Sequence, residues 1–343
     1  MEGSSNKVTH IVYGMERKEI ISKRFSVSES LAIIINSVII NNKANKLIDV
    51  QIKNGDILII ITGEGLPHTI KFNKQININD NILLLAMIKL CNEMSIINTR
   101  DNIQTTKVLN FKDVDDNSFE EDESAAMRLT PDNSIEFKIS KQNLHADVET
   151  MMKSENLKSI KAYLSHIYNE LIAMGSTVII FGEKITYKDK DGQMLNEKHT
   201  KIGVNRRVKL YRMKTQKKGI EVIVNGIKLE NTNIKNMINW NVPPFKQDGY
   251  TFKRLFISLF IEMEKVDLND ISLINEFIEK SMKNIRNKVQ LYKEYFTNEK
   301  VNINLEYDRA DMDRIKNSKG KYTASEATKA VLDGYLELIK RDD

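Results

Sequence analysis

The sequence contains very few of the residues that build disulfides and metal sites. Cys91 is the single cysteine, which excludes internal disulfides and any zinc site built from cysteines. The five histidines are widely scattered and show no metal-ligand spacing with one another. We therefore expect no disulfide framework and no histidine-built metal site, and the lack of paired cysteines indicates a reducing compartment.

Long apolar runs are lacking as well. No stretch approaches the roughly 18 apolar residues of a membrane-spanning helix, and residues 1–7 are polar, without the apolar core of a signal peptide. The sequence therefore predicts a protein that is neither secreted nor membrane-spanning. Its expected location is intracellular, in the cytoplasm or, if the source is eukaryotic, in the nucleus.

Three common catalytic patterns are also missing from the sequence. It has no phosphate-binding P-loop, no nucleophile elbow and no set of kinase motifs. Because no intact catalytic motif remains, the sequence assigns no catalytic residue, and this argues against an enzyme.

Length and composition are those of an ordinary globular protein. The chain has 343 residues, of which 41% are hydrophobic and 29% charged, and a chain of this length favours two domains over one. The net charge of +5 is small for a nucleic-acid binder, but the charge is unevenly distributed. Residues 113–123 hold seven acidic side chains and no basic one, whereas residues 201–218 hold eight basic side chains and no acidic one.

The first part of the chain shows clear helix and strand signals. Residues 8–13 predict a short strand, and a helix should run from Ser26, which has capping-box spacing to Glu29, to about Asn41. Apolar residues at spacings of three and four then place one helix face in the core. Four further features follow: alternating residues 48–52, a turn at Asn54-Gly55, an apolar run at 57–61, and a second helix at 80–94.

The rest of the chain alternates between irregular and regular patterns. Residues 99–131 lose periodicity and contain the acidic run, so we expect a mobile loop or linker there. An amphipathic helix should span 157–174 and end at Gly175. The other expected elements are strands at 135–139, 177–181, 204–213, 220–224 and 255–261, a turn at Asn225-Gly226, and helices at 271–296 and 324–340.

One passage resembles a known family. Residues 30–66 pair a helix carrying Asn36-Ser37 with a hairpin that ends in Gly63-Glu64-Gly65-Leu66. This order resembles the GHKL superfamily, which includes gyrase B, the ninety-kilodalton heat-shock chaperones, histidine kinases and MutL. In that family the helix carries a glutamate that activates water and an asparagine that binds magnesium. The strand then ends in Asp-x-Gly-x-Gly, whose aspartate reads the adenine amino group.

Matched position by position, this chain keeps part of that pattern. Asn36 falls on the magnesium asparagine, and Gly63 and Gly65 fall on the two glycines. The resemblance therefore implies that these three residues bind the cofactor and that Asn36 is the metal ligand, with ATP and magnesium as cofactors only if the family site is retained. Other readings stay open, because Asn36 can be a polar residue bonded at the helix edge and the glycines can simply end a strand.

The two acids of the family pattern are replaced. Ala32 stands at the position of the glutamate and Ile61 at that of the adenine aspartate, and residues 96–131 contain no glycine that could form the family's glycine-rich lid. In-line attack on a phosphate needs a positioned base, and an apolar side chain cannot accept a proton. We therefore do not expect hydrolysis by the family mechanism.

The second part of the chain resembles the transducer domain that follows GHKL modules. This resemblance rests on the helix at 157–174, the strands after it and residues 219–229. The expected fold class is α+β: a two-layer α/β sandwich of the GHKL type, then a smaller transducer-like α/β domain and C-terminal helices. The expected domains are residues 1–145, 146–296 and 297–343. Because family members commonly dimerise, the resemblance also implies a homodimer or a heteromeric protein partner.

The basic stretch is the strongest charge feature of the sequence. On a strand, its side chains would place cations on both faces and attract phosphates in a salt-dependent way, although only Tyr211 offers a stacking surface for bases. Protection of a strand edge by charge explains the same pattern without a ligand. The candidate nucleic-acid-binding residues are Arg206, Arg207, Lys209, Arg212, Lys217 and Lys218.

Three functions follow from these features. The leading hypothesis is a non-hydrolysing GHKL-like scaffold or regulatory subunit, with DNA as a candidate neighbour. The first alternative is a weakly active ATPase of the same family, whose base is supplied by Glu29, one turn before Ala32. The second alternative is a nucleic-acid-binding protein that uses residues 201–218.

Overall fold

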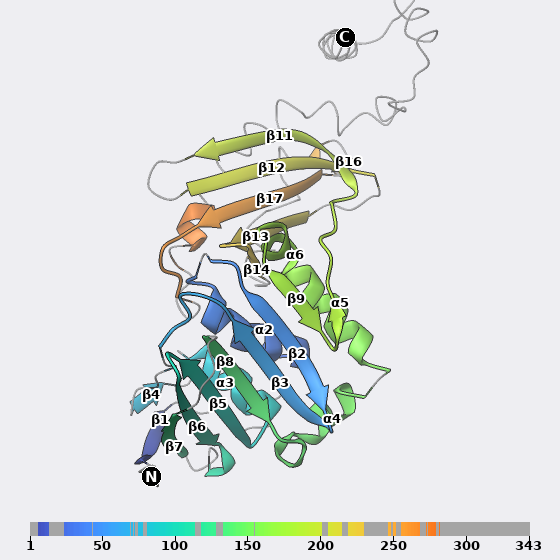
Figure 1. The fold of residues 1–343 in the computed structure, drawn as a ribbon. Helices are drawn as coiled ribbons and strands as arrows, with labels where there is room; N and C mark the ends of the chain where they lie inside the picture. Colours follow the sequence, from blue (N-terminus) through green and yellow to red (C-terminus); the bar gives the residue numbers. More distant parts are fainter. Residues whose placement is uncertain are drawn as a thin grey trace, which may run out of the picture.

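In the part of the chain that the structure describes, a layer of helices joins two large β-sheets (Figure 1). The structure is a computed structural model, and it describes residues 6–13, 24–42, 44–68, 70, 72, 75–77, 81–113, 118–127, 133–153, 155–200, 205–214, 219–229, 246–247, 250–251, 255–267, 272, 274–278 and 281.

The larger sheet has ten strands in the order β10-β9-β2-β3-β8-β5-β6-β7-β1-β4. All neighbours are antiparallel except β2 with β9 and β1 with β4, which are parallel. The side chains of β3 on the helix side of the sheet are fully buried. The strands are β1 Asn6–Tyr13, β2 Leu47–Lys53, β3 Asp56–Thr62, β4 Gln75–Asn77, β5 Glu93–Arg100, β6 Ile103–Asn110, β7 Ser118–Met127, β8 Ser134–Ile139, β9 Thr177–Ile180 and β10 Glu183–Lys184.

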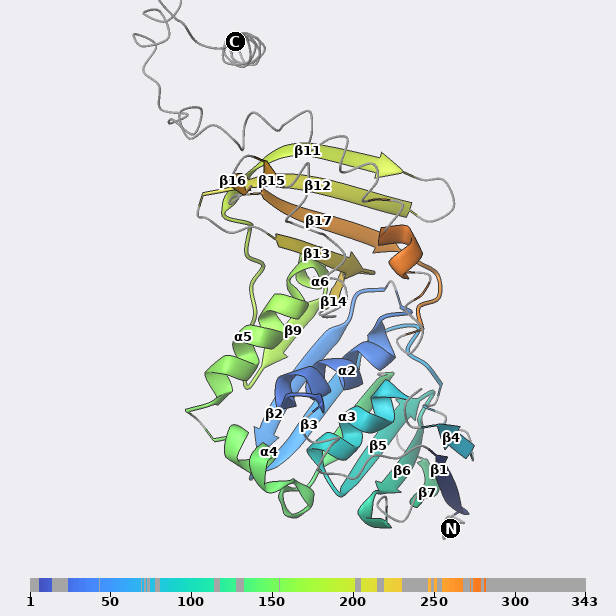
Figure 2. The ribbon, with the colours of Figure 1, turned by 180° about the vertical axis from the view of Figure 1, so that it is seen from behind.

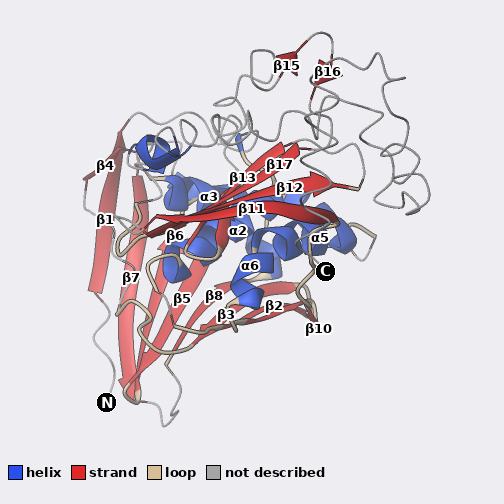
Figure 3. Ribbon diagram, turned by 90° about the horizontal axis from the view of Figure 1, so that it is seen from above, coloured by secondary structure: helices blue, strands red, loops and turns tan. Residues whose placement is uncertain are grey.

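Helices cover one face of this sheet, as Figure 2 shows from behind and Figure 3 from above. They are α2 Val27–Ile39, α3 Ile82–Leu90, α4 Ala146–Met151, α5 Leu157–Ile167 and α6 Asn169–Ala173. The predicted capping box starts α2: the Ser26 hydroxyl accepts a hydrogen bond from the Glu29 amide at 3.2 Å, and the Glu29 carboxylate accepts one from the Ser26 amide at 2.7 Å. The helix start, the capping box and the β2–β3 hairpin are therefore confirmed.

The second sheet lies at one end of the molecule, beyond α6 (Figures 1 and 2). Its five strands follow the order β11-β12-β17-β13-β14. Buried residues of both sheets and of the helices belong to one continuous core, which holds Leu31 and Ile61 together with Val222 and Leu255. The strands are β11 Gly192–Thr200, β12 Asn205–Met213, β13 Gly219–Val224, β14 Ile227–Leu229 and β17 Leu255–Glu262, with a separate pair β15 Lys246–Gln247 and β16 Tyr250–Thr251.

The predicted fold class is confirmed: a helix layer packs on a large sheet, and a smaller α/β part follows. The large sheet continues past residue 145, where the sequence placed a domain boundary. β9 pairs in parallel with β2, and β10 pairs with β9. Divided by sheets, the chain therefore changes from one sheet to the other after Lys184.

The expectation of a loop over residues 99–131 is wrong. β5 extends to Arg100, and β6 and β7 occupy most of the remaining described residues. Paired charges in place of apolar side chains explain the missing periodicity. On the inner face, Lys107 of β6 lies 2.5 Å from Glu121 of β7, and both side chains are buried. Residues 118–123 of the acidic run thus belong to a strand, and lysines of neighbouring strands partly neutralise its carboxylates.

Two other helix predictions differ from the structure. The helix expected at 80–94 ends at Leu90, and Met94 already belongs to β5. The helix expected at 157–174 is divided into α5 and α6 at Tyr168, whose φ of −97° and ψ of 7° are not helical. Of the helix expected at 271–296, the described residues 272, 274–278 and 281 are helical, and the one at 324–340 lies outside the described residues.

Candidate functional site

Asn36 lies in a closed contact between α2 and the break that separates α5 from α6. The Asn36 side chain is buried, and its Oδ1 atom accepts a hydrogen bond from the Tyr168 hydroxyl at 3.0 Å. The same hydroxyl lies 3.4 Å from the carbonyl oxygen of Ala32. Burial raises the pKa of Tyr168 well above its usual value, so the phenol keeps its proton and remains a donor. A cation at Asn36 would have to displace this hydroxyl.

The two glycines lie in another contact, where the loop after β3 packs on the loop between α2 and β2. Gly65 has a φ of +68°, and a Cβ atom there would lie 2.9 Å from Nδ2 of Asn42. Gly63 has a φ of +150°, and a Cβ atom there would lie 2.9 Å from Cδ of Lys46. Only glycine fits both the backbone angle and the close approach. The space left by the missing side chains of these glycines is therefore occupied by Asn42 and Lys46 of the protein itself.

Hydrogen bonds fasten these two loops to each other. The Asn42 amide group donates to the carbonyl oxygen of Glu64 at 2.8 Å. The Lys46 ammonium donates to Oδ1 of Asn42 at 3.0 Å and to the carbonyl oxygen of Ala44 at 2.7 Å. Burial lowers the pKa of Lys46, against the opposing charge of Glu64. The loops thus satisfy their own polar groups without a ligand.

Apolar side chains fill the space that follows on the helix side of the sheet. Ile61 is fully buried and pairs with Ile135 of β8. Ile70 lies against Ile96 and Ile135, and the remaining space there is about 10 Å³, enough for about one water molecule. Phe72 meets Phe119 edge to face at 6.0 Å between ring centres. The segment after Gly65 therefore covers this part of the sheet.

The structure does not unite the three residues that the resemblance names. Asn36 contacts Tyr168, whereas Gly63 and Gly65 contact the loop at 42–46, and no hydrogen bond of the described residues joins the two sets. Glu29 is held in the capping box of α2. Within the described part of the chain, no group of three or more histidine, cysteine, aspartate or glutamate side chains is placed to hold a metal ion.

The basic strand is an interior strand of the second sheet, because β12 pairs with β11 on one side and β17 on the other. Protection of a strand edge is therefore wrong as an explanation of its charge. Arg206 stacks on Phe277 on one face at 5.4 Å. Arg207 and Lys209 lie over Phe260 on the other face, at 4.3 and 5.5 Å. The side chain of Arg212 and the residues Lys217 and Lys218 lie outside the described residues.

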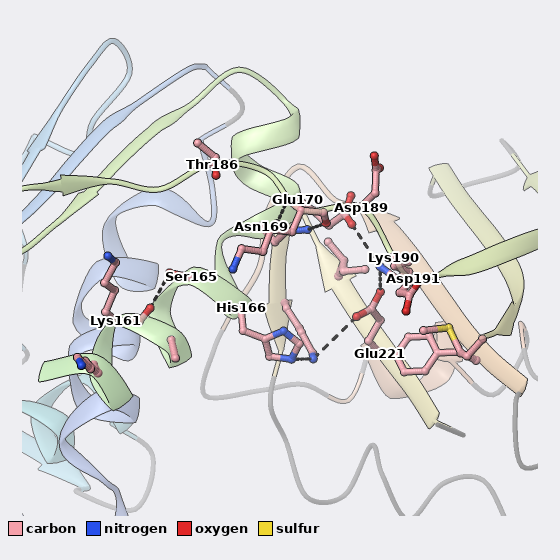
Figure 4. Close-up of a pocket in the computed structure, with 17 residues that line it drawn as sticks. Lys161, Ser165, His166, Asn169, Glu170, Thr186, Asp189, Lys190, Asp191 and Glu221 are labelled. Atoms are coloured by element: carbon pink, nitrogen blue, oxygen red, sulfur yellow. Dashed lines mark hydrogen bonds and ion pairs between the residues drawn. The ribbon is translucent and has the colours of Figure 1, made fainter. Parts of the chain in front are cut away.

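The structure also contains a cavity between α5–α6 and the second sheet, which the sequence did not predict (Figure 4). We call it the junction cavity; its volume is about 620 Å³, and its walls include Lys158, His166 and Glu170 on one side and Glu221, Lys228 and Phe256 on the other. These residues come from five elements in three separate stretches of the sequence, the α5–α6 pair, the β13–β14 pair and β17. No local motif could have indicated it.

Glu221 is the centre of the charge network at this cavity. Only 6% of this residue is exposed, and its Oε1 atom accepts hydrogen bonds from the Ser258 hydroxyl at 2.7 Å and the Lys190 ammonium at 2.5 Å. Lys190 also lies 3.4 Å from Glu170. Burial, and then the charge of Glu170, raises the pKa of Tyr187 to about 12. Burial and the same carboxylate also raise the pKa of Tyr211. Glu170 and Glu221 are therefore both bound by the Lys190 ammonium inside the protein.

Two asparagines connect the end of α2 to the second sheet. Asn225, in the turn between β13 and β14, donates from Nδ2 to the carbonyl oxygens of Ile40 at 2.7 Å and Met263 at 2.9 Å, and its Oδ1 accepts from the Met263 amide at 2.9 Å. Asn41 donates to the Val266 carbonyl oxygen at 2.9 Å and accepts from the Val266 amide at 2.5 Å. We call Asn41 and Asn225 the asparagine clamp. It fixes the second sheet to the helix that resembles the nucleotide-binding helix of the GHKL family.

Comparisons with known proteins find similarity among solved structures alone. No family model matches the sequence, and no curated protein matches it. The ATP-binding domain of topoisomerase IV from Francisella tularensis, solved with a small-molecule inhibitor, is 12% identical and has a TM-score of 0.45; 76% of this chain and 84% of that one are covered.

Two further structures show the same level of similarity. The B subunit of DNA gyrase from Myxococcus xanthus is 10% identical, with a TM-score of 0.39 and coverage of 69% of this chain and 78% of that one. The ATPase region of Saccharomyces cerevisiae topoisomerase II is 13% identical, with a TM-score of 0.41 and coverage of 75% and 82%. Such likenesses concern the course of the chain and not its chemistry. No helix in the described part of the chain is long and apolar enough to cross a membrane.

Proposed function

We propose that this chain is a non-hydrolysing GHKL-like protein that acts as a scaffold or regulatory subunit. The observation that carries the proposal is the contact of the Tyr168 hydroxyl with Asn36, at the position that resembles the magnesium ligand of the family. The two acidic positions of the family pattern hold Ala32 and the fully buried Ile61. Each position that would act on a nucleotide is thus apolar or already bonded within the protein.

The chemistry of hydrolysis supports the same conclusion. A water molecule that attacks a phosphate must be positioned and must lose a proton to a base. Ala32 cannot accept a proton, and the Glu29 carboxylate, one turn earlier, accepts a hydrogen bond from the Ser26 amide at the start of α2. Hydrolysis with Glu29 as the base would break this cap and cost about 1 kcal/mol of helix stability.

A scaffold role follows from how firmly the two sheets are joined. The asparagine clamp supplies three hydrogen bonds between the residues that end α2 and the second sheet or the segment after it, one from Asn225 to Ile40 and two between Asn41 and Val266. One continuous core runs through both parts. The chain therefore offers a rigid surface to a second copy of itself or to another protein, which are the partners that the sequence resemblance implies.

Nucleotide binding and phosphate release test the proposal directly. We expect no magnesium-dependent phosphate release from ATP, and no calorimetric binding of ATP or a non-hydrolysable analogue up to millimolar concentration. The matched variants are Asn36→Ala and Glu29→Gln, because glutamine keeps the capping box and cannot act as a base. If the protein releases phosphate and Asn36→Ala abolishes this release, the proposal is refuted. If Glu29→Gln abolishes the release, the ATPase alternative is established.

A second candidate function rests on one face of the second sheet. Arg207 and Lys209 lie over the buried ring of Phe260 and share the single carboxylate of Glu197, so this face keeps a positive charge that would attract the phosphates of a nucleic-acid strand. If a strand binds there, Arg207→Ser with Lys209→Ser should weaken binding and lower the slope of log affinity against log salt by about 2. The control is Lys53→Ser with Lys153→Ser, two exposed lysines elsewhere in the chain. Equal affinities of the two variants would exclude this function.

A further inference from the structure

The face of the ten-stranded sheet opposite the helices carries a row of alternating apolar and acidic side chains. Figure 1 shows this outer face in front of α2 and α3, and Figure 2 shows the helices on the other side. No helix of the described residues covers it. We call the row the outer-face row; its paired positions are Ile179 of β9, Asp49 of β2, Ile60 of β3, Glu136 of β8 and Ile97 of β5.

Alternation along the strands places this row outside the core. In β2, β3, β8 and β9 the residues directly before and after each row member are buried in the core on the helix side, so the row member points the other way. All five side chains are partly exposed. Because neighbouring strands lie about 4.8 Å apart, the backbones of Asp49 and Glu136 are roughly 10 Å apart, with Ile60 between them.

Neither acid of the row forms an ion pair within the described residues. Asp49 accepts a hydrogen bond from the neutral amide group of Gln51. Glu136 has Lys138 as its neighbour along β8, but the Lys138 ammonium lies 4.0 Å from Asp56. Both carboxylates of the row therefore lack a close cation in this part of the chain.

The negative charge is confined to the centre of the row. Lys184 stands opposite Ile179 at the sheet edge, two strand spacings or about 10 Å from Asp49. In the other direction the row continues from Ile97 into the uncharged Thr106 and Ser124. A second copy docked through the same face would bring carboxylates against carboxylates, which disfavours self-association here.

We propose that the outer-face row docks a basic amphipathic helix of a partner protein. On a helix, residues seven positions apart lie on one face and about 10.5 Å apart, which matches the spacing of Asp49 and Glu136. A lysine or arginine at each position pairs with one carboxylate, and an apolar side chain between them packs on Ile60. This surface is the partner site of the proposed scaffold and rests on that function. Peptide binding is measured without nucleotide, so it fails separately from the test of hydrolysis.

Fluorescence anisotropy of labelled peptides, titrated with the full chain, tests the site. The matched peptide has about 18 residues, mainly alanine and glutamine, with two lysines seven positions apart and leucines on the same face. In the spaced control the lysines are five positions apart and therefore on different faces, and in the reversed control both are glutamates. We expect saturable binding of the matched peptide that weakens with added sodium chloride, and weaker binding of both controls.

Two double variants decide whether the peptide occupies the row. Asp49→Asn with Glu136→Gln should weaken the matched peptide at least about threefold, and the new asparagine can still accept from Gln51. Glu149→Gln with Glu155→Gln, an equal charge change at two exposed positions around α4, should leave the affinity unchanged. Absence of saturable binding, equal binding of the spaced control, or equal affinities of the two double variants overturns the proposal.

Discussion

Replacement of Asn225 by alanine should loosen the joint between the two sheets, at a cost that its contacts define. The residue is buried, and its side chain makes three hydrogen bonds, to the carbonyl oxygens of Ile40 and Met263 and from the Met263 amide. Each lost bond costs about 1 kcal/mol net. Asn225 also has a φ of +51°, where alanine is disfavoured by about 1 kcal/mol relative to asparagine. We expect a loss of about 4 kcal/mol in the free energy of unfolding.

A matched variant separates the contribution of the hydrogen bonds from that of the left-handed backbone conformation. Asn54 has a φ of +56° in the β2–β3 turn, and its exposed side chain makes no hydrogen bond with the described residues. Asn54→Ala should therefore cost about 1 kcal/mol, from backbone strain alone. Urea denaturation followed by circular dichroism measures both variants, and one transition is expected because the core runs through both sheets. If Asn225→Ala costs no more than Asn54→Ala, the three side-chain hydrogen bonds of Asn225 do not stabilise the fold.

Three more replacements test other contacts by urea denaturation. Lys107→Met leaves the buried Glu121 carboxylate without its nearest lysine and should lower the free energy of unfolding by about 3–5 kcal/mol. The double variant Lys107→Met with Glu121→Leu should restore most of this loss. If stability does not recover, the unpaired charge of Glu121 is not the cause of the loss. Gly65→Ala should cost at least about 1 kcal/mol because of its φ of +68°, and an unchanged stability would show that the loop can rearrange. Burial opposes ionisation of Asp147, but the hydrogen bond and charge of Lys89 lower its pKa below the usual 3.8. Its stabilisation is therefore present above about pH 4 and lost as the pH falls further, so Asp147→Asn should destabilise at pH 7 and have little effect near pH 2; an equal effect at both would refute this.

Local signals in the sequence predicted local structure well. The capping box of Ser26 and Glu29 and the turn at Asn54-Gly55 involve residues within four positions of each other, and both are present. The strand β7 was missed because its inner face carries Glu121, which pairs with Lys107 of the neighbouring strand β6, so the alternation of apolar and polar residues is lost. A buried ion pair has no periodic signature in a single sequence, and its partner strand is needed to recognise it.

The candidate site also depends on contacts between distant residues, which a single sequence does not reveal. The resemblance placed Asn36 by its position on a helix, but the Tyr168 that occupies it is 132 residues away in the sequence. The junction cavity is assembled from positions between Lys158 and Phe256, and none of them is part of a motif. Contacts between elements so far apart depend on how the second sheet packs against α5. Pattern and spacing carry no information about that packing.

The polar groups near Asn36 and Gly65 differ from those at the junction cavity in how far they are already bonded within the protein. Around Asn36 and Gly65, polar atoms are bonded to Tyr168 and Asn42, so a ligand would have to break bonds that already exist. At the junction cavity, by contrast, a space of about 620 Å³ remains beside the network of Glu170, Lys190 and Glu221. A molecule that entered this space would displace water and would not have to break the contacts of Asn36 or Gly65. Ligand screening should therefore start from this cavity.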